Sequence, residues 1–207
     1  ILPPNPPFNL TNLQTEAYAL HGITPSATLR TAQSLYLAGL ISYPRTSSQK
    51  LPLSIGYDSI LKKLASHYNF ESLIKRSEPI EGKKPDPAHP SIYPTGNFQK
   101  LEDDEAKIYN LIARRFISLF CEDAVIDNKV VKAEINIEKD IVNIKKSFNK
   151  HNNIKVGSLV NKEVLTFSTR GGSIKNKGWM EVYPAKIIEK DIPDAEGEIK
   201  IGKSRTE

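Results

Sequence analysis

"AGLISYPRTSSQKLP", residues 38–52, places Tyr43 at the end of a short apolar run and directly before Pro44 and Arg45. Three hydroxyl side chains follow, those of Thr46, Ser47 and Ser48. The run "LISY" predicts a brief strand, and the proline favours an end to regular pairing because it has no N–H to donate. The stretch therefore predicts that Tyr43 lies at a strand end, beside a cation and a cluster of hydroxyls.

Two helices are predicted immediately before this stretch. Apolar residues three or four apart between residues 10 and 20 predict the first helix. Thr11 and Gln14 fit a capping box at its start, and Gly22 is expected to end it. Thr24 is expected to cap the second helix. Two helices joined by a short turn with a glycine, followed by a brief strand, have the order of a winged-helix unit of the CAP type.

After the quoted stretch, the sequence predicts a helix over residues 54–68 and a long loop over residues 81–96. The loop contains four prolines, and a loop of this length is typically either functional or a linker. From Leu101 an amphipathic pattern predicts a strong helix. Its expected buried stripe consists of Ile108, Ile112, Phe116 and Leu119.

Beyond that helix the hydrophobic period drops to two. Residues 130–138 alternate apolar and polar side chains, as a half-solvated antiparallel strand does. Polar residues 170–178 predict a turn or loop, and further strands are predicted at 140–144, 162–170 and 179–184. The predicted fold class is α+β. A helical winged-helix (CAP-like) domain that bears the tyrosine covers residues 1–98, and a helix plus antiparallel β-sheet segment covers residues 99–207.

Composition restricts the class of protein. The chain has 207 residues, 39% of them hydrophobic, and a net charge of +5, which suits a folded protein with a polyanionic partner. Cys121 is the one cysteine, so the chain has no internal disulfide and no cysteine-built zinc site, and a reducing interior is expected. The histidines show no ligand spacing, so no metal is assigned. No apolar stretch approaches the roughly 20 residues that span a bilayer.

The start, "ILPPNPPF", has neither an initiator methionine nor a signal-peptide pattern, and the end is abrupt. We expect a fragment of a longer protein. The expected location is the cytoplasm, in association with the nucleoid.

The chemistry predicted at Tyr43 is attack on phosphorus. A tyrosine hydroxyl has a solution pKa near ~10 and is a poor nucleophile until its phenolate is stabilised. Arg45 suits that task because a guanidinium stays protonated near neutrality and forks onto two phosphate oxygens. The phosphotyrosine ester would conserve the energy of the broken bond, so that DNA is resealed without ATP. The pattern favours reversible strand breakage over hydrolysis.

Three motifs carry a resemblance to a known family. "LYLAGLISYPRTSSQKLP" (35–52), "AHPSIYPTG" (88–96) and "GWMEVYP" (178–184) occur in this order. With them the chain resembles the type IA DNA topoisomerases, most closely the archaeal topoisomerase I/III branch, over nearly all of its length. The resemblance implies the tyrosine-bearing domain and the adjoining half of the β-rich hinge domain of the family's ring.

The resemblance also implies residue roles. Tyr43 is implied to cut one DNA strand and hold its 5′-phosphate, while Arg45 stabilises the scissile phosphate. His89 matches the family's phosphate-contacting histidine, whereas the residues alone favour a solvated loop histidine. Further DNA or phosphate contacts are expected from Thr46, Ser48, Lys83 and Lys84. Ser47 stands where many relatives have an acidic residue, and no role is carried over to it.

Mg²⁺ is the cofactor that the resemblance implies for the full-length enzyme. In the family it is bound by an acidic domain that lies N-terminal to this segment and is absent from this sequence, so no cofactor is expected within these residues. The expected partners are single-stranded or underwound DNA and that missing domain, with no membrane. The isolated fragment is expected not to relax supercoiled DNA.

Two other functions compete with this interpretation. A winged-helix DNA-binding regulator without catalysis would read duplex DNA through the second helix, although that helix offers few base-reading side chains besides Arg30 and Gln33. An interaction scaffold would use Tyr43 for packing alone.

Overall fold

The computed structural model describes residues 1–136 and 164–184. The chain divides into two compact units. Unit 1 is Ile1–Ile126 with Ile174–Ile187, and unit 2 is Asp127–Ser173 with Ile188–Glu207. The sequence-based boundary near residue 98 falls inside unit 1, and the strand predicted at 140–144 lies outside the described residues.

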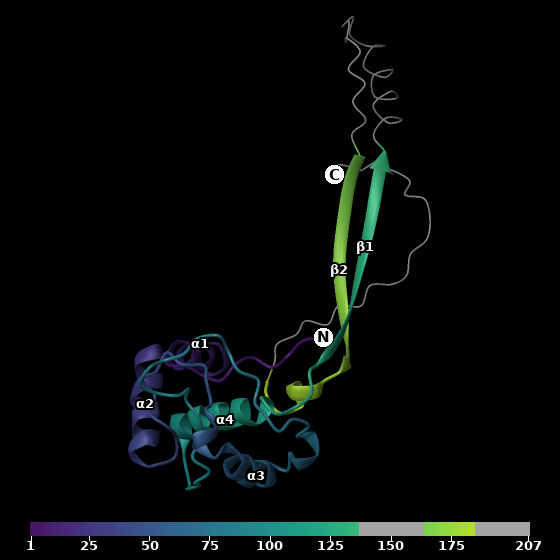
Figure 1. Cartoon of the computed structure of the whole chain (residues 1–207). Helices are drawn as coiled ribbons and strands as arrows, with labels where there is room; N and C mark the ends of the chain where they lie inside the picture. Colours follow the sequence, from purple (N-terminus) through teal and green to yellow (C-terminus); the bar gives the residue numbers. More distant parts are fainter. Residues whose placement is uncertain (137–163, 185–207) are drawn as a thin grey trace, which may run out of the picture. The chain divides into compact units, whose positions relative to one another are not determined.

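Unit 1 is built around one central helix. Its α-helices are α1 (Leu10–His21), α2 (Pro25–Leu37), α3 (Tyr57–Tyr68) and α4 (Asp103–Ser118). Its short 3-10 helices are η1 (Leu53–Ile55), η2 (Glu71–Leu73) and η3 (Gly178–Glu181). Helix α4 contacts each of the other three α-helices (Figure 1). The predicted apolar stripe of α4 is fully buried, as expected for a helix at the centre of the unit.

The predicted end of α1 and the predicted cap of α2 are confirmed, whereas the predicted cap of α1 is wrong. Gly22 ends α1 in the left-handed region at φ 71°, and the Thr24 hydroxyl accepts the Ala27 N–H at 3.3 Å to cap α2. The predicted capping box at Thr11 is wrong, because the extended backbone of Asn9 places the cap two residues earlier. The side chain of Asn9 accepts the Asn12 N–H at 2.9 Å.

The strand predicted at "LISY" is reduced to a short pairing with the long proline-rich loop. Ile41 forms an isolated antiparallel bridge with Pro94. The Ser42 N–H donates to the Tyr93 carbonyl at 2.9 Å, and the Thr95 N–H donates to the Leu40 carbonyl at 2.9 Å. The pairing stops at Tyr43, where the sequence placed the end of regular structure.

A buried charged cluster joins four parts of unit 1. Arg115 on α4 is 2% exposed and forms an ion pair with Glu16 on α1. Its guanidinium carbon lies 4.0 Å from the ring centre of Tyr183 and 4.6 Å from that of Phe8. The Tyr183 hydroxyl donates to the same carboxylate. Since a buried arginine is costly without a partner, the carboxylate and the two aromatic faces together stabilise its charge.

Replacing Glu16 with Gln keeps the shape of the side chain but leaves Arg115 without its counter-ion. We expect a loss of about 2 kcal/mol in the free energy of unfolding, below the usual cost for a fully buried pair because Glu16 is partly exposed. Urea denaturation followed by circular dichroism measures the loss. The control is Lys100→Ala, which breaks an exposed pair with Glu102 and should cost well under about 1 kcal/mol. Equal losses in the two variants would contradict this account.

The strands β1 (Val125–Asn136) and β2 (Val164–Asn176) form a two-stranded antiparallel sheet (Figure 1). The turn predicted over residues 170–178 is wrong for residues 170–176, which continue β2 through a pair of glycines. The strand predicted at residues 179–184 is also wrong. Gly178 has φ 49° and the Trp179 indole N–H donates to the Leu2 carbonyl at 3.0 Å, so the chain turns into η3 there. Trp179 and Tyr183 are buried against helices of unit 1 and not in a sheet.

Candidate functional site

The ring of Tyr43 is held between two other rings. Tyr36, on the last turn of α2, meets it edge to face with the ring centres 5.4 Å apart. His89 packs against it with the ring centres 4.7 Å apart and the planes tilted by 47°. Tyr43 is half-buried, while His89 is exposed. The sequence grouped Tyr43 with His89 only through the family motif, and it assigned no role at the site to Tyr36.

Local backbone geometry explains how these rings meet. Gly39 has φ 70°, a conformation that glycine adopts without strain, and it turns the chain back after α2. The following residues then pair with residues 93–95 of the proline-rich loop through the bridge at Ile41. His89 lies in the same loop, so this pairing brings it to the tyrosine from a distant part of the sequence.

The hydroxyls of Thr46 and Ser48 stabilise their own segment. Thr46 is 5% exposed, and its hydroxyl accepts the Ser48 N–H at 3.0 Å and lies 3.5 Å from the His89 carbonyl. The Ser48 side chain is 1% exposed and accepts the Lys50 N–H at 3.1 Å. Both residues lie beside the candidate nucleophile, but these internal bonds use the hydroxyls that were predicted to contact phosphate. Their contact with DNA stays a prediction.

Asp86 is a site residue that the sequence analysis missed. One carboxylate oxygen accepts the Ala88 and His89 N–H groups at 3.0 and 3.2 Å. The other accepts the Ser47 N–H at 3.2 Å and the Ser47 hydroxyl at 2.8 Å. These donors, first of all the Ala88 N–H, hold the pKa of Asp86 well below its usual range. A sequence signal was available, because an aspartate in a proline-rich loop commonly accepts backbone N–H groups shortly after it and forms an Asx turn.

Replacing Asp86 with Asn removes this charge-assisted cap and gives a pH-dependent loss of stability. Because folding lowers the pKa of Asp86 from about 3.8, the carboxylate stabilises the fold fully above that pH and progressively less as the pH falls below it. The urea midpoint of the wild-type chain should exceed that of D86N most clearly near about pH 6. The difference should shrink as the pH is lowered below 3.8. A difference that stays constant across this series would overturn the assignment.

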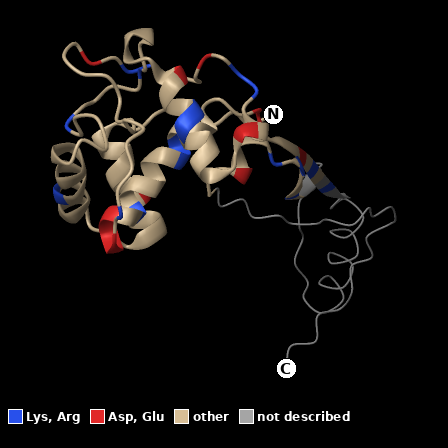
Figure 2. Ribbon diagram, turned by 90° about the horizontal axis from the view of Figure 1, so that it is seen from below, with Lys and Arg blue, Asp and Glu red and all other residues tan. Residues whose placement is uncertain are grey.

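The predicted cations lie on the surface near the site. Arg45, Lys83 and Lys84 are all exposed. The Lys84 carbonyl accepts the Gln49 N–H at 2.8 Å, and the Gly82 N–H donates to the Gln49 carbonyl at 3.1 Å, so the lysine segment runs beside the quoted stretch. In Figure 2 basic and acidic segments are interspersed over the helices of unit 1. Arg45, Lys83 and Lys84 thus add positive charge near the site, within a surface whose charges are otherwise mixed.

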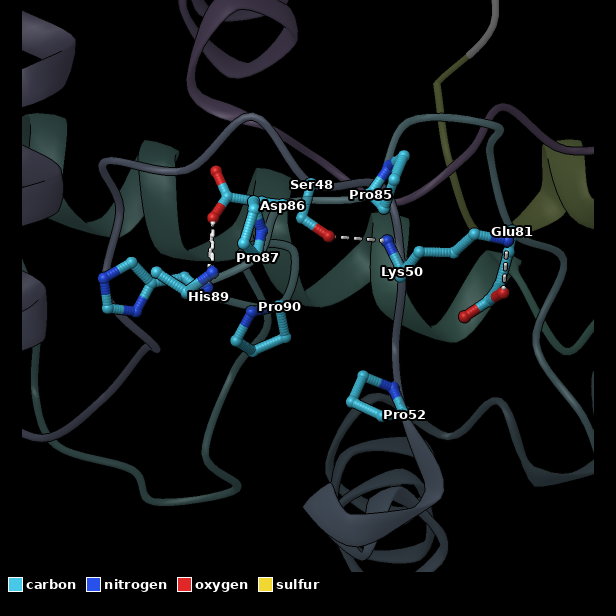
Figure 3. Close-up of a pocket in the computed structure, with 10 residues that line it drawn as sticks. Ser48, Lys50, Pro52, Glu81, Pro85, Asp86, Pro87, His89 and Pro90 are labelled. Atoms are coloured by element: carbon cyan, nitrogen blue, oxygen red, sulfur yellow. Dashed lines mark hydrogen bonds and ion pairs between the residues drawn. The ribbon is translucent and has the colours of Figure 1, made fainter.

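A cavity of about 500 Å³ opens beside His89 (Figure 3). Its walls come from the quoted stretch, through Ser48 and Lys50, and from the proline-rich loop, through Glu81 and Asp86. His89 lies at one end of the cavity and the Lys50–Glu81 ion pair, 2.9 Å long, at the other. His89 therefore lines the cavity and also packs against the Tyr43 ring.

Other chemistries find less support in the described part of the chain. Burial is the main cause that raises the pKa of the Cys121 thiol to about 12, so this residue is packing and not a nucleophile. Residues 1–136 and 164–184 contain no group of three or more His, Cys, Asp or Glu side chains placed to hold a metal ion. Within the same residues, no helix has the length and apolar character that crossing a membrane requires.

Comparison with known proteins decides the family. A sequence model described as DNA topoisomerase matches residues 1–206. The chain belongs to the type IA DNA topoisomerases. DNA topoisomerase 1 of Methanothermobacter thermautotrophicus is 42% identical over 200 residues, which are 94% of this chain and 24% of the relative. DNA topoisomerase 1 of Pyrococcus horikoshii is 37% identical over 203 residues, 93% of this chain and 26% of the relative.

The fold agrees with this membership. Full-length topoisomerase I from Thermotoga maritima superposes with a TM-score of 0.60 at 20% identity, covering 95% of this chain and 30% of that one. The mixed arrangement of helices and a small antiparallel sheet is therefore that of a topoisomerase I region. The chain spans about a quarter of the length of the two archaeal topoisomerases.

Proposed function

We propose that this region supplies the cleaving tyrosine of a type IA topoisomerase. Tyr43 attacks a phosphodiester of a single DNA strand, so that the phenolic oxygen becomes bonded to the 5′-phosphate and the 3′ oxygen of the preceding sugar leaves with a proton. Attack by that hydroxyl on the phosphotyrosine reverses the step and reseals the strand without ATP. The observation that carries the proposal is the packing of Tyr43 between Tyr36 and His89, two residues before the exposed Arg45.

In the proposed reaction Arg45 stabilises the negative charge on the scissile phosphate. Its guanidinium remains charged throughout the reaction and can hold two oxygens of the scissile phosphate as negative charge develops. In the proposal His89 contacts the same phosphate, and the packing of its ring against Tyr43 supports this role. Lys83 and Lys84 attract the strand through its backbone charge, a contribution that weakens as salt rises.

The remaining parts of the reaction belong to the rest of the enzyme. In the proposal Mg²⁺ is held by an acidic domain outside this sequence, which faces Tyr43 during cleavage. The tyrosine-bearing domain then moves away with the covalently held 5′ end, and a second strand crosses the gap. The substrate is single-stranded or underwound DNA in the nucleoid of the cytoplasm.

Replacing Tyr43 with Phe in the complete topoisomerase should abolish the covalent adduct, because phenylalanine has no oxygen to join to phosphorus. Denaturing gels of the enzyme with a labelled single-stranded oligonucleotide and Mg²⁺ measure the adduct, and plasmid relaxation measures turnover. The matched control is Tyr18→Phe, which alters a tyrosine that is 62% exposed on α1 and should behave as the wild type does. Relaxation by the Tyr43→Phe enzyme would refute the proposal.

The chain alone should not relax negatively supercoiled plasmid in the presence of Mg²⁺. The physical reason is that this segment contributes the nucleophile and Arg45, whereas the metal site lies in the acidic domain. It should still bind single-stranded oligonucleotides weakly, with an affinity that falls steeply as salt rises. Robust relaxation by the pure chain would contradict this division of the reaction between domains.

A further inference from the structure

We propose that the cavity beside His89 binds one nucleobase next to the cleaved phosphate and thereby biases where the strand is cut. The inference rests on the proposed function of Tyr43. The cavity, of about 500 Å³, is large enough for a base with part of its sugar. Because His89 both lines the cavity and packs against the Tyr43 ring, a strand whose phosphate reaches the tyrosine has a neighbouring nucleotide within reach of the cavity.

The walls of the cavity suit a base better than a phosphate. The proline rings that line it are apolar and lack N–H donors; they belong to Pro52, Pro85, Pro87 and Pro90. The carboxylates of Glu81 and Asp86 also line it, and they repel a second phosphate. A nucleobase is neutral and has a flat apolar face, so it meets the proline rings without an electrostatic penalty.

The cavity also contains a hydrogen-bond donor with unused capacity. The Lys50 amine has three donors, and the structure uses one of them for Glu81 at 2.9 Å. The lysine side chain is 43% exposed, so a base that enters can reach it. A donor of this kind favours bases with carbonyl or ring-nitrogen acceptors at the contacted edge.

The cavity is rigid enough to discriminate between bases. The second oxygen of Glu81 accepts the Leu51 N–H at 2.7 Å, which ties one wall to the quoted stretch. Gly82 allows the loop to approach closely, because a Cβ at that position would lie 2.4 Å from the Gln49 side-chain oxygen. Asp86 fixes the opposite wall through its four bonds to N–H and hydroxyl donors. A preformed wall of this kind turns differences in base shape into differences in binding.

The experiment uses the complete topoisomerase and a set of single-stranded oligonucleotides with one strong cleavage site. Each of the nucleotides that flank the break is replaced in turn by the other bases and by an abasic residue, and the adduct yield is measured on denaturing gels. In the wild type, an abasic residue at one flanking position should lower the yield roughly fivefold or more. Lys50→Ala and Pro87→Ala should show a weaker dependence on the base at that same position.

The control variant is Lys100→Ala, which breaks an exposed ion pair away from the cavity and should keep the wild-type base dependence. Normal adduct formation with an unchanged base dependence in both cavity variants would overturn this inference and leave the proposed function intact. Absence of any adduct from the wild-type enzyme would overturn the proposed function, and this inference with it.

Discussion

The antiparallel pairing of residues 40–42 with residues 93–95 is the constraint on which the site depends. Two backbone hydrogen bonds of 2.9 Å and the bridge between Ile41 and Pro94 align the quoted stretch with the proline-rich loop. The pairing ends at Tyr43 on one side and leaves His89 a few residues upstream on the other. Because proline has no N–H, the loop cannot extend this pairing into a regular sheet. The side chains of Tyr43 and His89 meet where the pairing ends.

Electrostatics near the tyrosine follow from the way Asp86 is bonded. An acidic side chain beside a DNA phosphate would normally oppose binding. Here the carboxylate is stabilised by backbone N–H groups and the Ser47 hydroxyl, which belong to the quoted stretch and the proline-rich loop. The bonds to Asp86 therefore fix the loop without the side-chain charges of Arg45, Lys83 or Lys84. These cations remain exposed on the surface that the proposed reaction assigns to DNA.

The helical parts of the fold could be predicted from the sequence, because hydrophobic periodicity and helix caps depend on residues that are close together in the chain. The buried stripe of α4, the end of α1 at Gly22 and the cap of α2 at Thr24 were all predicted. The strand predicted at residues 179–184 failed because its aromatic residues pack into the helical core, a tertiary effect that overrides strand propensity. The turn predicted at residues 170–176 was wrong for the opposite reason. These residues belong to a paired strand, which tolerates the glycines that would otherwise indicate a turn.

The same distinction holds for the site. Tyr43, Arg45 and His89 were predicted from a specific motif, whereas the contacts of Tyr36 and Asp86 arise only in the folded chain. Edge-to-face and tilted ring contacts are each worth about 0.5–1.5 kcal/mol, enough to orient a phenol and too little to lock it. Tyr36, Tyr43 and His89 all belong to unit 1. In the proposed reaction the tyrosine would therefore keep its orientation while its domain carries the DNA end away, because the rings that hold it travel with it, whereas the metal site remains behind.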